Sequence, residues 1–394
     1  MFIRTAIKTL FFKLIQIWTF LLIFCLTFSS HYNKTVHQQA YIWQKKWLKT
    51  LDISIKQSSP YIEAWHFLAG EYEPEGIIRY PNINFKLLKK TSLPLIAVYR
   101  FDRLHPLPSS KELLNLIQNS PAFKEFHIHS IELDLDWPSL KLMAYVTLIR
   151  ELRRQLPNDI RFYFTALPDW LNSASFPQLT EQAEAPILQL HAIENPKEGI
   201  FNEKKAQVYI NQMNRLSKKP FYIALPTYGL KVNWLPSGNL AFIAGENKTA
   251  LNYAGHEFYS DPILLSRFVA KLELNTPRKL KGLIWFRLPV SNDQRNWSLK
   301  TWKALLTKER LYSSYIILFN KDKNLAHIFT IEILNTGNTP LSLPKKINLT
   351  CSIGDGFFPY TITNDNNDNA MLILTNFPYL LNTDTRLQVG WMRC

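Results

Sequence analysis

The stretch Ile131-Glu-Leu-Asp-Leu-Asp-Trp-Pro138, followed by residues 139–155, decides the fold of this chain. In the first part, acidic and leucine residues alternate, which is the period-two pattern of a β-strand. In the second part, apolar residues recur at spacings of three and four, which is typical of a helix with one apolar face. The stretch therefore predicts one strand followed directly by one helix.

The same unit repeats along the chain. Runs rich in β-branched, aromatic and leucine residues predict seven further strands, at 41–47, 62–73, 95–102, 161–167, 187–193, 221–228 and 282–288. Apolar periodicity predicts further helices at 111–118, 202–216, 262–274 and 298–306. Because strands separated by helices pair in parallel, eight units over roughly 270 residues predict an α/β fold, a (β/α)8 TIM-like barrel at 40–311. An open doubly wound sheet is the alternative, but no glycine-rich turn follows the first strand.

The segment 231–259, after the seventh strand, is longer than the other connections. In a barrel, such an insertion lies on the face where ligands bind.

Residues 312–394 have a different character. Short strand patterns at 315–319, 327–334, 347–351, 370–376 and 385–391 predict a small all-β, sandwich-like domain. The polar run 364–369 is predicted to be a solvated loop, because it lacks the closing glutamate of a calcium-binding EF-hand. Cys351 and Cys394 lie in this region, where they form either a disulfide or two buried thiols.

The N-terminus predicts export. Arg4, Lys8 and Lys13 precede an apolar run at 14–28, so residues 1–29 are either a signal peptide or an N-terminal membrane anchor. The run is short for a span, which needs about 20 apolar residues. In both cases the rest of the chain is predicted to be exported, and it is either periplasmic or anchored to the inner membrane facing the periplasm.

The composition excludes several classes of protein. Hydrophobic residues make up 46% of the 394 residues and charged residues 20%, which excludes a disordered chain. The formal net charge of +15 comes partly from the export signal and from outer barrel helices. It indicates contact with anionic lipid or cell-surface polymer, and no nucleic-acid-binding motif accompanies it. No zinc-binding, P-loop or nucleophile-elbow motif occurs, so we predict neither a metal nor a cofactor.

The candidate chemistry begins with Glu132, Asp134 and Asp136, which share one face of their strand. Helices cover the outside of a barrel, so this face is predicted to point inward, with Asp136 nearest the carboxyl-end rim. Neighbouring buried carboxylates raise one another's pKa, which is how a general acid is made at neutral pH. We therefore predict Asp136 as acid/base and Asp134 as the group that modulates its pKa.

The other strand ends contribute further candidates, because they converge on the same mouth. Glu71 and Asp169 are candidate second carboxylates. The predicted substrate-binding residues are Arg100, Asp102, Glu132, His191, Tyr228, Trp285 and Arg287. Acids, arginines and aromatic rings around a cleft suit an oligosaccharide. In the alternative, Arg100 and Arg287 only neutralise Asp134 and Glu132, and His191 is a hydrogen-bonded core histidine.

Six segments carry a resemblance to a known family. They are Tyr41-Ile-Trp-Gln44, Leu68-Ala-Gly-Glu71, Ile131-Glu-Leu-Asp-Leu-Asp136, Thr165-Ala-Leu-Pro-Asp-Trp170, Ala224-Leu-Pro-Thr-Tyr-Gly229 and Leu283-Ile-Trp-Phe-Arg-Leu-Pro289. Over residues 40–390 the chain resembles a family of exported bacterial proteins classed only as a domain of unknown function. The resemblance implies export and a barrel, but no reaction.

A more distant resemblance is to barrel glycoside hydrolases. Asp134-Leu-Asp136 is similar to the middle of the Asp-x-x-Asp-x-Asp-x-Glu signature of the chitinase-type family, but Pro138 stands where the catalytic glutamate belongs. A proton donor would then come from Asp136, Glu71 or Asp169.

The predicted function is an exported, glycoside-hydrolase-like barrel that acts on or binds an envelope or extracellular polysaccharide. The alternative is a non-catalytic envelope binding or assembly protein. Two carboxylates about 5–10 Å apart in an open cleft favour an enzyme. Acids closed off by arginines favour the alternative.

Overall fold

A computed structural model describes the chain from residue 36 onward. The described ranges are 36–73, 76–101, 106–191, 196–244, 255–293, 295–325, 327–351, 353–364, 370–375 and 380–394. The predicted signal peptide or anchor at 1–29, Asp102 and residues 365–369 of the polar run lie outside them. Within these ranges, no helix has both the length and the apolar character needed to cross a membrane.

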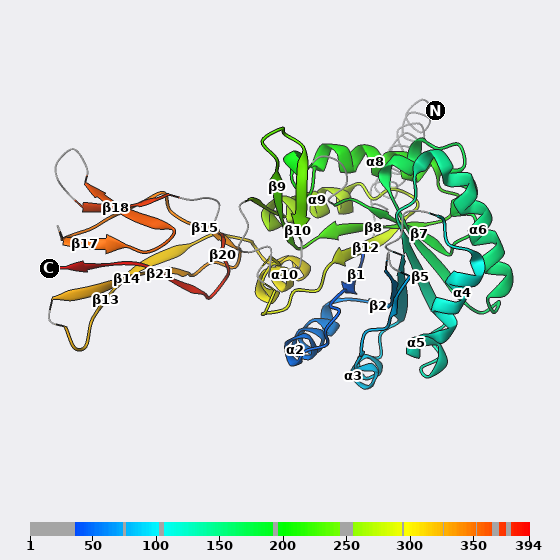
Figure 1. The fold of residues 1–394 in the computed structure, drawn as a ribbon, viewed down its shortest axis with the longest axis horizontal. Coiled ribbons are helices and arrows are strands. Elements are labelled where there is room, and N and C mark those ends of the chain that lie inside the picture. Colours follow the sequence, from blue (N-terminus) through cyan, green and yellow to red (C-terminus); the bar gives the residue numbers. More distant parts are fainter. Residues whose placement is uncertain are drawn as a thin grey trace, which may run out of the picture.

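Eight parallel strands form a closed barrel, as predicted (Figure 1). They are β1 (His37–Ile42), β2 (Trp65–Tyr72), β4 (Leu95–Phe101), β5 (Ser130–Leu135), β6 (Arg161–Ala166), β7 (Ala185–Gln189), β8 (Phe221–Pro226) and β12 (Leu280–Phe286). The barrel closes because β1 pairs with β2 on one side and with β12 on the other. The short β3 (Ile78–Arg79) pairs antiparallel with β2.

Helices surround the strands (Figure 1). The five predicted helices correspond to α4 (Ser110–Asn119), α6 (Leu142–Gln155), α8 (Glu203–Leu216), α9 (Pro262–Leu274) and α10 (Leu299–Leu306). The sequence did not predict α2 (Lys49–Ser58), α3 (Phe85–Lys90), α5 (Pro121–Lys124) and α7 (Phe176–Thr180). Ser109 caps the start of α4 and forms a reciprocal capping box with Glu112.

The first strand begins earlier than predicted. The sequence placed it at 41–47, whereas β1 covers His37–Ile42 and the chain then turns toward α2. The strand begins with the polar residues His37, Gln38 and Gln39, so a search for apolar runs did not identify its start. Gln39 faces the barrel interior, where its Oε1 lies 2.8 Å from His66 Nε2, so a polar residue is satisfied inside the barrel.

The strands separate two layers of side chains. On β5, Ile131, Leu133 and Leu135 belong to the large apolar core between strands and helices. Glu132 and Asp134 point to the barrel interior, where they pair in register with Val98 and Arg100 of β4. The predicted inward orientation of the acids is therefore confirmed.

The long insertion after β8 forms a three-stranded antiparallel sheet of β9 (Gly229–Trp234), β10 (Leu240–Ala244) and β11 (His256–Tyr259). Glu257 on β11 accepts two hydrogen bonds from Arg295, at 2.9 and 3.0 Å, which ties the sheet to the segment after β12. Gly229 is required where β9 meets β11, since a Cβ there would lie 2.8 Å from the Phe258 carbonyl oxygen.

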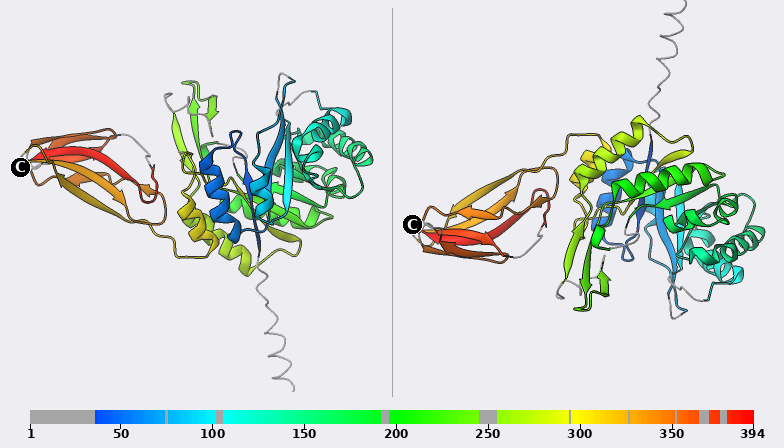
Figure 2. Two further views of the ribbon diagram at one scale, coloured as in Figure 1. Left: turned by 90° about the horizontal axis from the view of Figure 1, so that it is seen from below. Right: turned by 90° about the horizontal axis from the view of Figure 1, so that it is seen from above.

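The C-terminal region consists of antiparallel sheets that lie to one side of the barrel (Figures 1 and 2). Their strands are β13 (Tyr315–Lys321), β14 (Ile328–Asn335), β15 (Leu341–Ser342), β16 (Lys346–Asn348), β17 (Ile353–Gly356), β18 (Tyr360–Asn364), β19 (Ala370–Leu374), β20 (Leu380–Leu381) and β21 (Arg386–Arg393). They share an apolar core that includes Ile331, Ile347 and Leu372. The predicted all-β character is confirmed, although β15, β17, β18 and β20 were not predicted.

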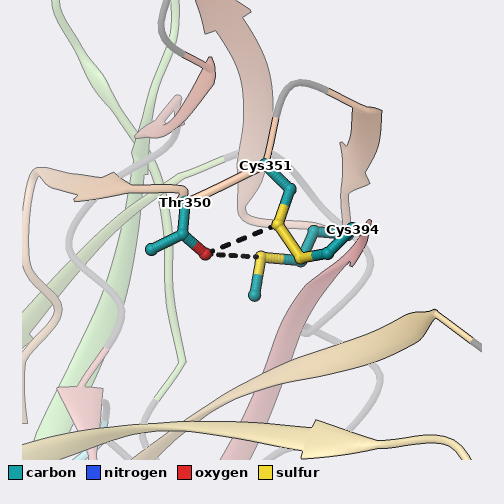
Figure 3. Close-up of a disulfide and its surroundings, with 4 residues drawn as sticks. Thr350, Cys351 and Cys394 are labelled. Carbon is teal, nitrogen blue, oxygen red and sulfur yellow. Dashed lines mark hydrogen bonds between the residues drawn. A yellow bond between two sulfur atoms is a disulfide. The ribbon is translucent and has the colours of Figure 1, made fainter.

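Cys351 and Cys394 form a disulfide (Figure 3). Their Cα atoms are 5.2 Å apart across a sequence separation of 43 residues. Of the two alternatives that the sequence left open, the structure therefore has the disulfide. It joins the end of β21 to the segment that precedes β17, so it ties down the last strand of the region.

Candidate functional site at the barrel mouth

A pocket of about 180 Å³ lies at the carboxyl ends of the barrel strands. The ends of seven of the eight barrel strands contribute to it, as expected for strand ends that converge. Its lining residues are Tyr41, Trp43, Arg100, Asp134, Asp136, Thr165, Gln189, His191, Ala224, Tyr228 and Phe286. The structure thus brings together five of the predicted site residues: Arg100, Asp134, Asp136, His191 and Tyr228.

The acids of β5 lie at three depths. Glu132 is completely buried, the Asp134 side chain is 18% exposed, and Asp136 is exposed at the rim. Asp134 and Asp136 both line the pocket, while Glu132 lies beneath it. Only the two outer acids are therefore within reach of a ligand, and the predicted substrate-binding role does not fit Glu132.

Glu132 is held by a buried polar cluster. Its Oε1 accepts hydrogen bonds from Tyr41 Oη at 2.6 Å and Thr165 Oγ1 at 3.0 Å. Its Oε2 lies 2.6 Å from Nδ1 of His66, which is equally buried. Burial, followed by the charge of Glu132, raises the pKa of Tyr41 well above its usual value, so Tyr41 remains a donor. This cluster forms a fixed polar floor under the pocket.

Asp134 has an unusual proton affinity. Burial raises its pKa to about 7, and the neighbouring charge of Asp136 raises it further, against the lowering effect of Arg100. The predicted rise of a carboxyl pKa on this strand is confirmed. At neutral pH, Asp134 therefore carries a proton for a large fraction of the time.

Arg100 lies between two carboxylates. Its Nε is 3.9 Å from Asp134 Oδ2, and its guanidinium is 3.4 Å from Glu71 Oε1. Glu71 is buried and also pairs with Lys45 Nζ at 2.6 Å, and it does not line the pocket. Glu71 is therefore engaged with two cations, which does not suit a second catalytic carboxylate.

Arg287 does not neutralise the acids of β5, so this part of the alternative is wrong. The Arg287 side chain is buried and pairs with Asp293, which lies six residues further along the chain. Its guanidinium also lies over the ring of Tyr228, 5.6 Å from the ring centroid. Arg287 thus supports the wall of the pocket from behind.

Aromatic rings form the wall opposite β5. Phe286 is at their centre, with ring centroids 5.5 Å from Tyr41, 5.1 Å from Trp43 and 5.6 Å from Tyr228. His191 stacks on Phe286 at 4.9 Å, and its Nδ1 is 3.1 Å from Tyr228 Oη. Burial lowers the pKa of His191 to about 3, so this histidine is neutral and acts as a hydrogen-bonded part of the wall.

Trp285 is not at the mouth, contrary to the prediction. It is completely buried in the outer core, where its Nε1 donates to Gln38 Oε1 at 2.7 Å. Its neighbour Phe286 points into the pocket instead. The segment Gly282-Leu-Ile-Trp-Phe286 is apolar at alternate and adjacent positions alike, so its pattern does not reveal which face is internal.

Two other predicted residues remain, Asp169 and Asp102. Asp169 is exposed on the short helical turn Pro168–Asn172 and is not among the lining residues. Asp102 lies outside the described residues. Three residues of the site were not predicted from the sequence: Phe286 and Thr165, which line the pocket, and His66, which lies beneath it. Tyr41 and Trp43 lie on either side of Ile42 at the end of β1, and this alternation indicates that the two rings share one face. Which face points into the barrel follows only from the pairing register of the closed sheet.

Comparison with known families classifies the chain. Residues 91–291 match a Domain of unknown function (DUF3142), and residues 319–394 match a second Domain of unknown function (DUF8456). The first match covers just over half of the 394 residues, so the chain belongs to the DUF3142 family. The predicted resemblance to such a family is confirmed. Among curated protein sequences, none matches the chain.

Several solved structures have a similar fold. The spore cortex-lytic enzyme SleL of Bacillus cereus has a TM-score of 0.50 and 11% identity, covering 70% of this chain and 74% of SleL. SleL of Bacillus megaterium QM B1551 has a TM-score of 0.50 and 12% identity, with the same coverage of 70% and 74%. The GH18 chitinase ChiB of Flavobacterium johnsoniae has a TM-score of 0.44 and 10% identity, covering 69% and 94%. The chain thus has a distant structural similarity to the SleL cortex-lytic enzymes, which concerns the fold alone.

Proposed function

We propose that this chain is an exported glycoside-hydrolase-like protein that binds and cleaves a polysaccharide at the barrel mouth. The observation that carries this proposal is the pocket itself. It sets Asp134 and Asp136 on one side against the rings of Tyr41, Trp43 and Phe286 on the other. Aromatic rings bind the apolar face of a sugar ring, while carboxylates and amides bind its hydroxyls.

The acid pair supplies the proton. Asp134 and Asp136 are two residues apart on one strand, and the pKa of Asp134 is raised to about 7. The pair therefore carries a proton at neutral pH. Asp136, at the exposed rim, donates it to the oxygen of the glycosidic bond as that bond breaks. In the last step a water molecule replaces the nucleophile at the anomeric carbon, and the pair takes up the proton that this water loses.

Among the residues that the structure describes, both lining acids come from one place: Asp134 lies on β5 and Asp136 directly follows that strand. The usual two-carboxylate mechanisms place the second carboxylate across the scissile bond. A substrate that carries its own nucleophile, such as the amide oxygen of a 2-acetamido sugar, fits a one-sided acid pair better. We therefore propose 2-acetamido glycans as the substrate class.

The test compares two acids and two substrates. Asp136→Asn is expected to lower the hydrolysis of an N-acetylglucosamine oligomer by about 100- to 10,000-fold, the usual contribution of a general acid. Asp169→Asn, an exposed acid outside the pocket, is the matched control. Chitin and spore cortex are the first polymers to test, since the structurally similar proteins are a chitinase and cortex-lytic enzymes. Cello-oligomers, which lack the acetamido group, should not be cleaved. Unchanged turnover in Asp136→Asn would refute the assignment.

The alternative function, a non-catalytic envelope binding or assembly protein, is favoured by two observations. The pocket of about 180 Å³ is smaller than the roughly 300–1,000 Å³ usual for ligand sites. Arg100 also contacts Asp134 at 3.9 Å, which favours a bound rather than a reacting carboxylate. Binding of oligosaccharides without any release of product would support this alternative.

The proposed location is outside the cytoplasm, in the periplasm or on the inner membrane facing it. It is supported by the basic and apolar N-terminus and by the Cys351–Cys394 disulfide, since disulfides persist in oxidising compartments. N-terminal sequencing of the protein recovered from the envelope tests it. A new N-terminus near residue 30 indicates a cleaved signal peptide, and an intact Met1 in the membrane fraction indicates an anchor.

A further inference from the structure

A second cavity lies where the barrel meets the C-terminal sheets. Its volume is about 370 Å³, about twice the 180 Å³ of the mouth pocket. Both parts of the chain line it, with Tyr259 and Trp297 from the barrel side and Leu341 and Leu380 from the C-terminal sheets. The volume falls within the range usual for ligand sites, which begins at roughly 300 Å³. We refer to this space as the junction cavity.

Polar contacts between the two parts hold the walls of the junction cavity in place. Lys300 Nζ contacts both carboxylate oxygens of Asp384, at 2.9 and 3.0 Å. Thr383 Oγ1 donates to Ser298 Oγ at 2.7 Å. On the connecting segment, the backbone N–H of Tyr312 donates to Asn338 Oδ1 at 2.8 Å. These contacts join the two sides at separate points, so the cavity is formed in the absence of a ligand.

The lining selects for a neutral ligand with an apolar face. Trp297 and Tyr259 present aromatic surface, and Ser313, Ser342 and Asn382 present small polar groups. Asp261 is the one lining residue among the described ones with a charged side chain, and its Oδ1 already accepts from the N–H groups of Ile263 and Leu264 at the start of α9. No lysine or arginine lines the described wall, so nothing there attracts a phosphate or carboxylate.

Asn296 in this lining has an unsatisfied acceptor. The residue is 4% exposed, and its Nδ2 donates to the Arg287 carbonyl oxygen at 3.1 Å. Its Oδ1 has no hydrogen-bond partner within the described part of the chain. A buried acceptor without a donor destabilises the folded state, so this wall of the cavity carries a polar cost within the protein itself.

The junction cavity and the mouth pocket share a wall. Ser260, which lines the junction cavity, donates through Oγ to the Tyr228 carbonyl oxygen at 3.0 Å. Tyr228 lines the mouth pocket and forms an isolated β-bridge with Asn296. The bridged backbone of Tyr228 and Asn296 therefore lies between the junction cavity and the mouth pocket.

We propose that the junction cavity binds one neutral sugar residue as a second glycan site, distinct from the barrel mouth. A sugar ring matches the lining, because its apolar face packs on aromatic residues while its hydroxyls reach the serines and asparagines. The choice of a glycan rests on the proposed function at the mouth. The site itself does not require hydrolysis.

The test fills the cavity from two exposed positions. Ser342→Trp and Ser313→Trp place a large ring at its edge, and Thr361→Trp, on the exposed face of β18, is the matched control. Calorimetry with the purified full chain uses three probes: the trisaccharides of N-acetylglucosamine, glucose in β-linkage and glucose in α-linkage. For at least one probe we expect Ser342→Trp and Ser313→Trp to weaken one binding event at least tenfold, and Thr361→Trp to leave it unchanged.

Phe286→Ala, in the wall of the mouth pocket, separates the two sites. If the mouth proposal fails and the junction proposal holds, Phe286→Ala leaves binding unchanged while the two serine variants still weaken it. If the serine variants, folded by circular dichroism, bind every probe as well as Thr361→Trp does, the junction cavity is a water-filled joint and the proposal is overturned. Absence of binding by all three probes overturns it equally.

Discussion

The two sides of the barrel strands are held together by different forces. Toward the helices, the strands bury apolar residues, among them the completely buried Trp65 and Trp285. Toward the barrel axis, they bury Gln39, His66 and Glu132, which satisfy one another by hydrogen bonds. The outer layer therefore gains stability from apolar area removed from water. The inner layer combines such burial, in a smaller apolar cluster that includes Val98, Ile187 and Ile284, with the pairing of polar groups.

This difference separates stability from chemistry along a single strand. On β5, Leu133 packs in the outer core while the adjacent Asp134 lines the pocket with a pKa of about 7. Burial is the largest cause of this raised pKa, followed by the charge of Asp136, and the packed outer layer holds β5 in the position that produces both. Substitutions in one layer that leave the other unchanged measure how independent the two layers are.

The largest effect is expected at Trp285 and Phe286, neighbours on β12 that point to opposite layers. Trp285→Ala should lower the free energy of unfolding by about 3–5 kcal/mol, because it empties a large site in the packed outer core. Phe286→Ala should cost less stability but weaken glycan binding at the mouth. Urea denaturation and calorimetric titration measure the two effects. If Phe286→Ala proved the more destabilising, the proposed division of labour between the layers would be wrong.

The next effect concerns two His–Glu pairs in opposite environments. Glu132→Gln should destabilise the protein by about 3 kcal/mol, near the lower end of the usual cost of breaking a buried pair, because glutamine keeps the shape and one acceptor oxygen. The control is Glu63→Gln. Glu63 contacts His37 with about half of each side chain exposed (52% and 50%), so this change should stay within roughly 1 kcal/mol. Equal costs in denaturant titrations would show that the inner layer gains nothing from burial of its pair.

The smallest effect is a dependence of stability on pH. The folded-state pKa of Asp134 is raised to about 7 from the usual 3.8, so the folded protein holds a proton there that the unfolded chain releases. Stability attributable to Asp134 is therefore full below about pH 4 and is lost as pH rises to about 7, by on the order of 1–3 kcal/mol. Melting temperatures of wild type and Asp134→Asn, measured from pH 4 to 8, should diverge in this window, with the variant favoured at high pH. Parallel curves would contradict the raised pKa.

Much of the barrel could be predicted from the sequence, because its strands and helices differ in period. On β5, acids alternate with leucines, and only an inward direction is compatible with helices on the outside. The same reasoning fails on β12, where Ile284, Trp285 and Phe286 are all apolar and either face fits the core. On β12 the hydrophobic pattern therefore does not show which side chains point into the barrel and which point toward the helices.

The buried polar cluster under the pocket could not be predicted from the sequence, for a different reason. Gln39, His66 and Glu132 come from three strands, and their contact depends on which residue of each strand lies at the same height in the barrel. That register is a property of the closed sheet and leaves no mark in any local pattern. Arg287 illustrates the opposite case, since its partner Asp293 is six residues away and was overlooked in favour of distant acids.

The pairing of β1 with β12, which closes the barrel, has a consequence for the folding of the newly synthesised chain. The two strands are parallel neighbours, yet about 240 residues of chain separate residue 42 from residue 280. At about 5–20 residues per second, synthesis of that interval takes roughly 10–50 s, and during this time β1 lacks the partner on one of its edges. An unpaired strand edge is a template for association with other chains. The nascent protein therefore has a long interval in which its first strand needs protection, and that interval ends only when the eighth barrel strand arrives.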